Sequence, residues 1–155
     1  MDDNELRKQA RKHLDCIRWL DRRIDQDIIE LDQLKRRAVS LGATDYSRVI
    51  VKSSHDNSME AIIAKIVDQQ AAINRRIDLL ANMKAAISAE IDALEKPDHQ
   101  TVLRYRYICL CKWEDIANRM GYDRRHVSRI HNSALKAFSE KMSHNVPPEG
   151  ATMIV

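Results

Sequence analysis

Cysteine and histidine side chains in the C-terminal third are the first candidates for chemistry. Cys109 and Cys111 share this stretch with His99, His126 and His131, and thiolates and imidazoles are preferred zinc ligands. A Cys-X-Cys pair is unlike the ligand spacing of structural zinc sites, however, and free cysteines commonly pack as small apolar side chains. We therefore expect no metal site in this segment.

Residue patterns for catalysis are also weak. The carboxylates of residues 21–32 alternate with arginines, which is typical of the solvated surface of a coiled coil. No Ser/His/Asp or Cys/His arrangement stands out. Gly42, Gly121 and Gly150 lie too far apart for a phosphate-binding loop or a dinucleotide-binding fingerprint. The sequence thus predicts a protein that is not an enzyme and that needs no cofactor.

Basic side chains are concentrated in the same C-terminal third. Residues 96–142 carry 10 Lys and Arg against 5 Asp and Glu, whereas the whole chain has a net charge of only +3. A positive field confined to one segment attracts polyanions. The charge distribution therefore favours a nucleic acid as the partner of this segment.

Residues 113–130 have the pattern of a helix-turn-helix. Ala117 is small where two helices would cross closely, and Gly121 permits the positive φ of a tight turn. Asp123 can cap the second helix. Apolar residues before, between and after these positions would form the core, with Val127 and Ile130 on the inner face of the second helix.

The outer face of that second helix would enter the major groove of double-stranded DNA. Arginine pairs with guanine, and asparagine pairs with adenine. The candidates for base contacts are Arg124, Arg125, Ser128, Arg129 and Asn132. The candidates for phosphate contacts, which fix orientation without reading sequence, are Arg104, Arg106, Lys112, Arg119, His126 and His131. The alternative is an arginine-rich face that is only solvated.

Two long amphipathic stripes precede this segment and would position it. From Leu6 to Leu41, and again from Met59 to Leu94, apolar residues recur in ten steps over 35 residues, which is the period of a coiled coil. The stripes predict a long antiparallel helical hairpin. Such a hairpin would join two copies of the chain as a homodimer or bind a protein partner.

Caps and breakers set the expected helix boundaries. Gly42 is expected to cap the first long helix, and Pro97 to stop the second. Asn57 and Glu60 resemble a capping box at the start of the second helix. Asp98 can cap a following helix over residues 99–109.

One polar residue interrupts the second stripe. Gln70 is either a buried amide that specifies register, as in some coiled coils, or an amide near the surface.

Composition and the order of these patterns give an all-α protein. Only three Gly and three Pro occur in 155 residues. The expected organisation is a helical hairpin over 1–96, a helix-turn-helix domain over 97–142 and a tail over 143–155.

No stretch approaches the roughly 20 apolar residues that span a bilayer, and residues 1–10 lack the apolar run of a signal peptide. Three cysteines form no disulfide framework, so a reducing cytoplasm is the expected compartment.

Residues 99–138 resemble region 4 of the sigma-70 family of RNA polymerase sigma factors. The pieces that carry the resemblance are Leu103-X-X-Arg-Tyr107, Trp113-Glu-X-Ile-Ala117, Met120-Gly-Tyr122 and Ile130-His-X-X-Ala-Leu135. Over its whole length, the chain is similar to a family of small phage and prophage proteins of unknown function. Those proteins resemble the ArpU and RinA-like late-gene regulators.

This resemblance implies DNA binding in a transcriptional setting, with host RNA polymerase as a second candidate partner. The chain has no recognisable counterpart of the sigma region that melts promoter DNA, so an activator or accessory factor is favoured over a self-sufficient sigma factor. Two alternatives stay open. One is a DNA-packaging protein like a small terminase subunit, and the other is a module that binds RNA polymerase without DNA specificity of its own.

Overall fold

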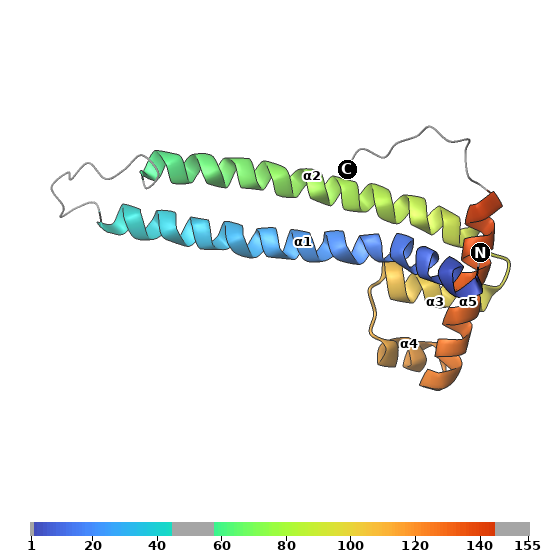
Figure 1. Ribbon diagram of the computed structural model, residues 1–155. Coiled ribbons are helices and arrows are strands. Elements are labelled where there is room, and N and C mark those ends of the chain that lie inside the picture. Colours follow the sequence, from blue (N-terminus) through green and yellow to red (C-terminus); the bar gives the residue numbers. More distant parts are fainter. Residues whose placement is uncertain (1, 45–57, 145–155) are drawn as a thin grey trace. The chain divides into compact units, whose positions relative to one another are not determined.

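The computed structural model describes residues 2–44 and 58–144, and every regular element in these two ranges is a helix (Figure 1). This confirms the predicted all-α class. The elements are α1 (Asp3–Thr44), α2 (Met59–Asp92), α3 (Pro97–Leu103), the π-helix η2 (Arg104–Ile108), α4 (Trp113–Met120) and α5 (Arg124–His144). Within the described ranges, no helix has the length and apolar content needed to cross a membrane. The predicted cap at Asn57 lies outside the described residues.

The chain divides into two compact units. The first unit combines the beginning of α1, up to Arg18, with the chain from Met83 onward. The second unit is Trp19–Asn82, which contains the rest of α1 and α2. The division therefore differs from the predicted boundary at residue 96, because the start of the chain belongs to the same unit as α3, α4 and α5.

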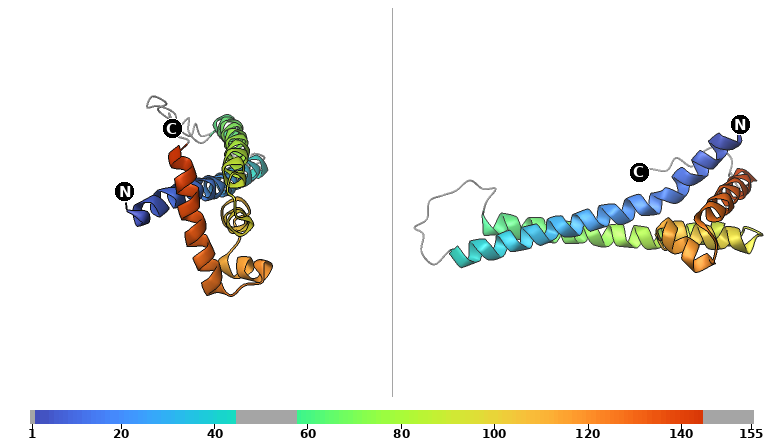
Figure 2. Two further views of the ribbon diagram at one scale, coloured as in Figure 1. Left: turned by 90° about the vertical axis from the view of Figure 1, so that its right-hand side faces the viewer. Right: turned by 90° about the horizontal axis from the view of Figure 1, so that it is seen from below.

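The core of the first unit draws on all of its helices. Its largest fully buried apolar side chains are Leu14, Ile17, Ile91, Val102, Leu103, Tyr107, Ile116, Val127, Leu135 and Phe138. Polar contacts join the beginning of α1 to the other elements. Figure 2 shows α5 beside the beginning of α1, where Lys136 Nζ lies 2.7 Å from Asp3 Oδ2. His13 Nε2 likewise lies 2.8 Å from Glu90 Oε2 of α2.

In the second unit, α1 and α2 run antiparallel and bury one face each (Figure 1). A polar layer lies within this packing. Asp27 of α1 is only 2% exposed and forms ion pairs with Arg23 and with Arg76 of α2. Gln69 donates a hydrogen bond of 3.1 Å to the backbone carbonyl of Asp27. Of the two interpretations of Gln70, the structure agrees with an amide near the surface, since its side chain is exposed and bonds to Asn74 of its own helix.

The ends of the long helices differ from prediction. α1 continues to Thr44, so Gly42 lies inside the helix and does not cap it. α2 begins after Ser58, whose Oγ accepts a hydrogen bond from the Ala61 amide at 3.2 Å. α2 then ends at Asp92, before Pro97 is reached.

The predicted helix over residues 99–109 is two elements. Pro97 is the first residue of α3, a position that suits proline because the amide there has no intrahelical acceptor. Asp98 therefore lies in the first turn and does not cap the helix. η2 follows directly, and after it Leu110 has a φ of 57°, a conformation that few residues with a side chain adopt.

Replacing either of the two described glycines by alanine is expected to change the stability, with opposite sign at the two positions. Gly121 has a φ of 71° and nothing within 4 Å of the position of an added Cβ, so Gly121→Ala is expected to cost about 1 kcal/mol through backbone conformation alone. Gly42 is helical and an added Cβ would meet only Met59 Cε, at 3.5 Å. Gly42→Ala should therefore stabilise the protein by about 0.5 kcal/mol. Thermal unfolding of the two variants measures both changes, and a stabilised Gly121→Ala would contradict this account.

Candidate nucleic-acid interface

A three-residue turn joins α4 to α5. Its first residue, Gly121, adopts the left-handed conformation that the sequence predicted, and the Tyr122 amide bonds to the carbonyl of Ala117 at 3.1 Å. Asp123 caps α5, because its Oδ1 accepts a hydrogen bond of 2.8 Å from the His126 amide. The turn is thus fixed at both ends, so the direction in which α5 starts relative to α4 is set by local bonds.

α5 has one buried and one exposed face along its first three turns. Val127, Ala134 and Leu135 are fully buried, on the face that packs toward the core of the first unit. The residues predicted to contact bases all lie exposed on this helix, and they are Arg124, Arg125, Ser128, Arg129 and Asn132. The first turn of α5 contains no acidic residue. The exposed face therefore offers hydrogen-bond donors in a positive field.

Among the base-contact candidates, Arg124 forms an ion pair within the described part of the chain. Its Nη1 lies 3.2 Å from Glu114 Oε1 of α4, and both side chains are exposed. A pair of this kind contributes little to stability, since water screens it. Arg124 can therefore exchange Glu114 for another acceptor at small cost.

Three of the phosphate-contact candidates are exposed near this face. Lys112 is the residue directly before α4, and Arg119 lies in the last turn of α4 with its guanidinium 5.9 Å from the centre of the Tyr105 ring. His126 meets the Tyr122 ring edge-on, with the ring centres 4.6 Å apart. All three side chains are accessible to an anion.

Arg104 and Arg106 are held by contacts inside the first unit. Arg104 forms an ion pair with Asp92 at the end of α2. Arg106 Nη1 donates a 3.0 Å hydrogen bond to the carbonyl of Cys111, and its guanidinium lies 4.5 Å from the centre of the Trp113 ring. These two arginines therefore fix η2 and the segment that leads into α4, and a phosphate would have to compete with those contacts.

His131 is buried and therefore does not offer a charge to a phosphate, contrary to its prediction as a phosphate contact. Its Nε2 lies 2.8 Å from the hydroxyl of Tyr107, which is itself buried. Burial lowers the pKa of His131 to about 4, and the charges of Arg11 and Arg106 act in the same direction. The imidazole is therefore neutral at physiological pH. Its position on the inner face of α5 follows from its place four residues after Val127.

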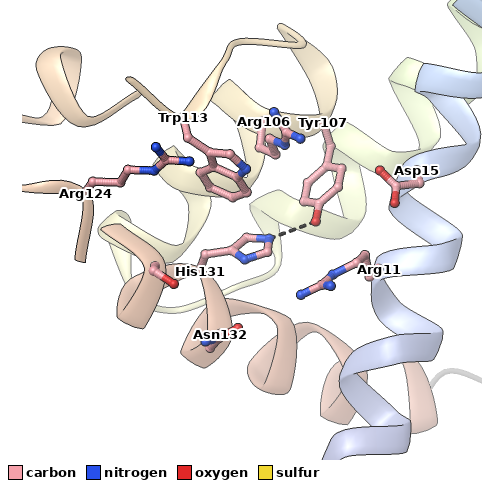
Figure 3. A pocket seen from close by; sticks show the side chains of 9 residues that line it. Arg11, Asp15, Arg106, Tyr107, Trp113, Arg124, His131 and Asn132 are labelled. Carbon is pink, nitrogen blue, oxygen red and sulfur yellow. Dashed lines mark hydrogen bonds between the residues drawn. The ribbon is translucent and has the colours of Figure 1, made fainter. Parts of the chain in front are cut away.

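A pocket of about 320 Å³ lies beside the exposed face of α5 (Figure 3). The residues that line it are Arg11, Asp15, Arg106, Tyr107, Trp113, Arg124, Ser128, His131 and Asn132. Figure 3 shows Arg11 and Asp15 approaching the Tyr107–His131 pair from α1. Sequence reasoning missed both residues, because nothing in the local pattern of residues 6–41 distinguishes them from other charged residues on a helix surface. They add a cation and an anion next to the predicted interface.

No cysteine is among the residues that line this pocket. Cys109 is exposed, Cys111 is partly exposed, and its Sγ lies 4.0 Å from the carbonyl of Cys109. Across residues 2–44 and 58–144, no three His, Cys, Asp or Glu side chains are grouped so that they could hold a metal ion. His99 is buried, and burial lowers its pKa.

Comparison with known proteins gives one family. A family model described as "Protein of unknown function (DUF1492)" matches residues 40–139. The matched span contains α2, α3, η2, α4 and most of α5. No curated protein and no solved structure matches the chain. Because the match covers more than half of the 155 residues, the chain belongs to the DUF1492 family.

Proposed function

We propose that this protein is a phage-type transcriptional regulator that binds double-stranded DNA through a helix-turn-helix formed by α4 and α5. The observation that carries the proposal is the exposed face of α5, where two further arginines, Arg125 and Arg129, join Arg124, Ser128 and Asn132. In this proposal α5 lies in the major groove, the one groove of B-DNA that admits a helix.

The roles of the side chains follow from their positions on α5. Arg125 and Arg129 are one helical turn apart, so both reach the same side of the helix. Either guanidinium can bind the O6 and N7 atoms of guanine, and Asn132 can bind the N6 and N7 atoms of adenine. Lys112 and Arg119 would bind phosphates on either side and fix the position of α5 in the groove.

The setting of the proposed function comes from the resemblance to sigma region 4. That resemblance supports transcription in a bacterial host cell, with RNA polymerase as a second partner. We further propose that α1 and α2 form a long antiparallel hairpin, like a coiled coil, that presents the DNA-binding unit to a partner. The antiparallel packing of α1 and α2 within the second unit supports this part.

Selection from a random pool of double-stranded DNA tests the proposal. The full-length protein at near-physiological salt should enrich one motif, and its affinity for that motif should fall steeply with salt, because several phosphate contacts release counterions. With about four such contacts, the affinity should drop roughly 100-fold between 50 mM and 200 mM salt.

The outcomes of the selection separate the proposed function from its alternatives. One enriched motif supports a sequence-specific regulator. Binding without enrichment, together with ring-shaped assemblies of many chains, would replace the proposal by a DNA-packaging protein. If the folded protein binds no DNA but captures RNA polymerase, the proposal would be replaced by a polymerase-binding module.

A further inference from the structure

α2 carries a second row of side chains beside the row that packs on α1. The packed row includes Ile62 and Ile73, and each member of the second row lies one residue later than a member of the packed row. The second row consists of Ile63, Val67, Gln70, Asn74, Ile77 and Ala81, and all six are exposed. Ile63, Val67 and Ile77 are 50%, 61% and 45% exposed. Large apolar residues gathered on one exposed face mark an interaction surface.

The second row has the spacing of a coiled-coil seam. From Ile63 to Ala81 its members follow one another in steps of four, three, four, three and four residues, which are the alternating steps of a and d positions. The row contains no charge. Glu60 lies one step before it and Lys84 one step after it on the same helix, and these two residues are about 36 Å apart along the axis.

The row is also symmetric about Ala72. In both directions from this residue, the row has one amide and then two apolar side chains. The next position beyond each end carries a charge, and the two charges have opposite sign. A second α2 that runs antiparallel therefore places Val67 opposite Ile77 and Gln70 opposite Asn74. Each of these residue pairs joins an a position of one helix to a d position of the other, as antiparallel packing requires.

Charge selects the antiparallel orientation. In the antiparallel arrangement Glu60 lies opposite Lys84 at both ends of the seam, giving two attractive pairs. A parallel arrangement places Glu60 against Glu60 and Lys84 against Lys84, which is repulsive at both ends. The seam is therefore complementary to itself in one direction only.

We propose that two copies of this chain associate through this second row of α2, antiparallel and about a two-fold axis near Ala72. The same surface of each copy then faces its counterpart, as in other two-fold dimers. Gln70 Nε2 lies 3.3 Å from Asn74 Oδ1 within one chain, and the remaining polar groups of both amides bind the amides of the partner copy. A polar layer at the centre of an apolar seam specifies the register. The dimer goes beyond the proposed function and does not depend on DNA binding.

A pair of matched valine variants tests the surface. Val67→Asp puts a carboxylate into the proposed seam, whereas Val39→Asp makes the same change on α1 at a side chain that is 73% exposed and outside the row. Sedimentation equilibrium of the full chain should give a dimer whose dissociation constant rises on the order of 100-fold in Val67→Asp. Val39→Asp should leave the constant unchanged. Circular dichroism checks that both variants keep their helices.

Charge reversal tests the orientation. Glu60→Lys and Lys84→Glu should each weaken the dimer about five- to tenfold, because each creates two repulsive pairs. The double variant Glu60→Lys/Lys84→Glu restores attraction at both ends and should recover the affinity of the unmodified protein. A parallel dimer would show no loss in either single variant, because like charges would face each other in the unmodified protein and in all three variants.

Three results would overturn the inference. A chain that stays monomeric up to about 0.5 mM would exclude a self-association of useful strength. A dimer that survives Val67→Asp with helices intact would show that another surface forms it. Single charge reversals that leave the affinity unchanged, or a double reversal that fails to recover it, would reject the antiparallel arrangement.

Discussion

Replacing Arg125 and Arg129 together by alanine is expected to lower the affinity for a selected DNA motif at least about 30-fold. Each arginine that binds a guanine edge contributes about 1–3 kcal/mol of discrimination, and 1.4 kcal/mol corresponds to a factor of ten. The two side chains lie on one exposed face of α5, one turn apart, with no described ion pair to break. Fluorescence anisotropy with the motif, and with a scrambled duplex of the same length, gives the affinity and the specificity.

A control of equal charge separates base recognition from general attraction. Arg22→Ala/Arg36→Ala removes the same two positive charges from exposed positions on α1, in the second unit. This control should change the affinity only slightly, and it should leave the ratio between motif and scrambled duplex unchanged. If Arg125→Ala/Arg129→Ala binds the motif as tightly as the control does, α5 is not the helix that reads the bases.

Acidification is expected to destabilise the first unit by about 2 kcal/mol between pH 7.5 and pH 5. Burial holds the pKa of His131 at about 4 in the folded state, against a usual value of 6.5 in the unfolded chain. Below pH 6.5 the unfolded chain therefore binds a proton that the folded chain does not. The contribution of His131 to the free energy of unfolding is therefore full above this pH. It decreases as the pH falls toward 4, the pKa of His131 in the folded state. His99, whose pKa is also lowered by burial, adds a change of the same sign.

Urea unfolding at a series of pH values measures this loss. In a Trp19→Phe background, Trp113 is the remaining tryptophan and reports on the first unit, since it lies edge-on to His131 with the ring centres 4.7 Å apart. His131→Gln should remove most of the decline, whereas His126→Gln, at an exposed histidine, should retain it. An unchanged decline in His131→Gln would assign the pH dependence to other groups.

Much of the helical architecture could be predicted because it depends on local patterns. The period of the two long stripes gave α1 and α2, and Gly121 and Asp123 gave the turn before α5. The register between α1 and α2 could not be predicted this way. The stripe selects Ile77 because it is apolar, but Arg76 takes the interior position because Asp27 on α1 offers it a buried carboxylate. That partner is 49 residues away in the sequence.

The candidate interface shows the same limit. The exposed face of α5 follows from helical periodicity, so its five polar residues were found from the sequence. Burial of His131 depends on Tyr107, which lies 24 residues earlier, and Arg11 reaches the neighbouring pocket from the beginning of the chain. Such partners have no signal in a local pattern, since they are created only when distant segments pack together.

The division of α1 between two units has a consequence for changes in the length of the chain. The chain leaves the first unit after Arg18 and returns to it at Met83, in both places through an uninterrupted helix. Removing or inserting seven residues in each of the two helices between these points shifts the angular position of the following residues by only about 20°. The segment between them is thus an adjustable spacer. Such paired changes of length are expected to leave the contacts around α5 within the first unit intact.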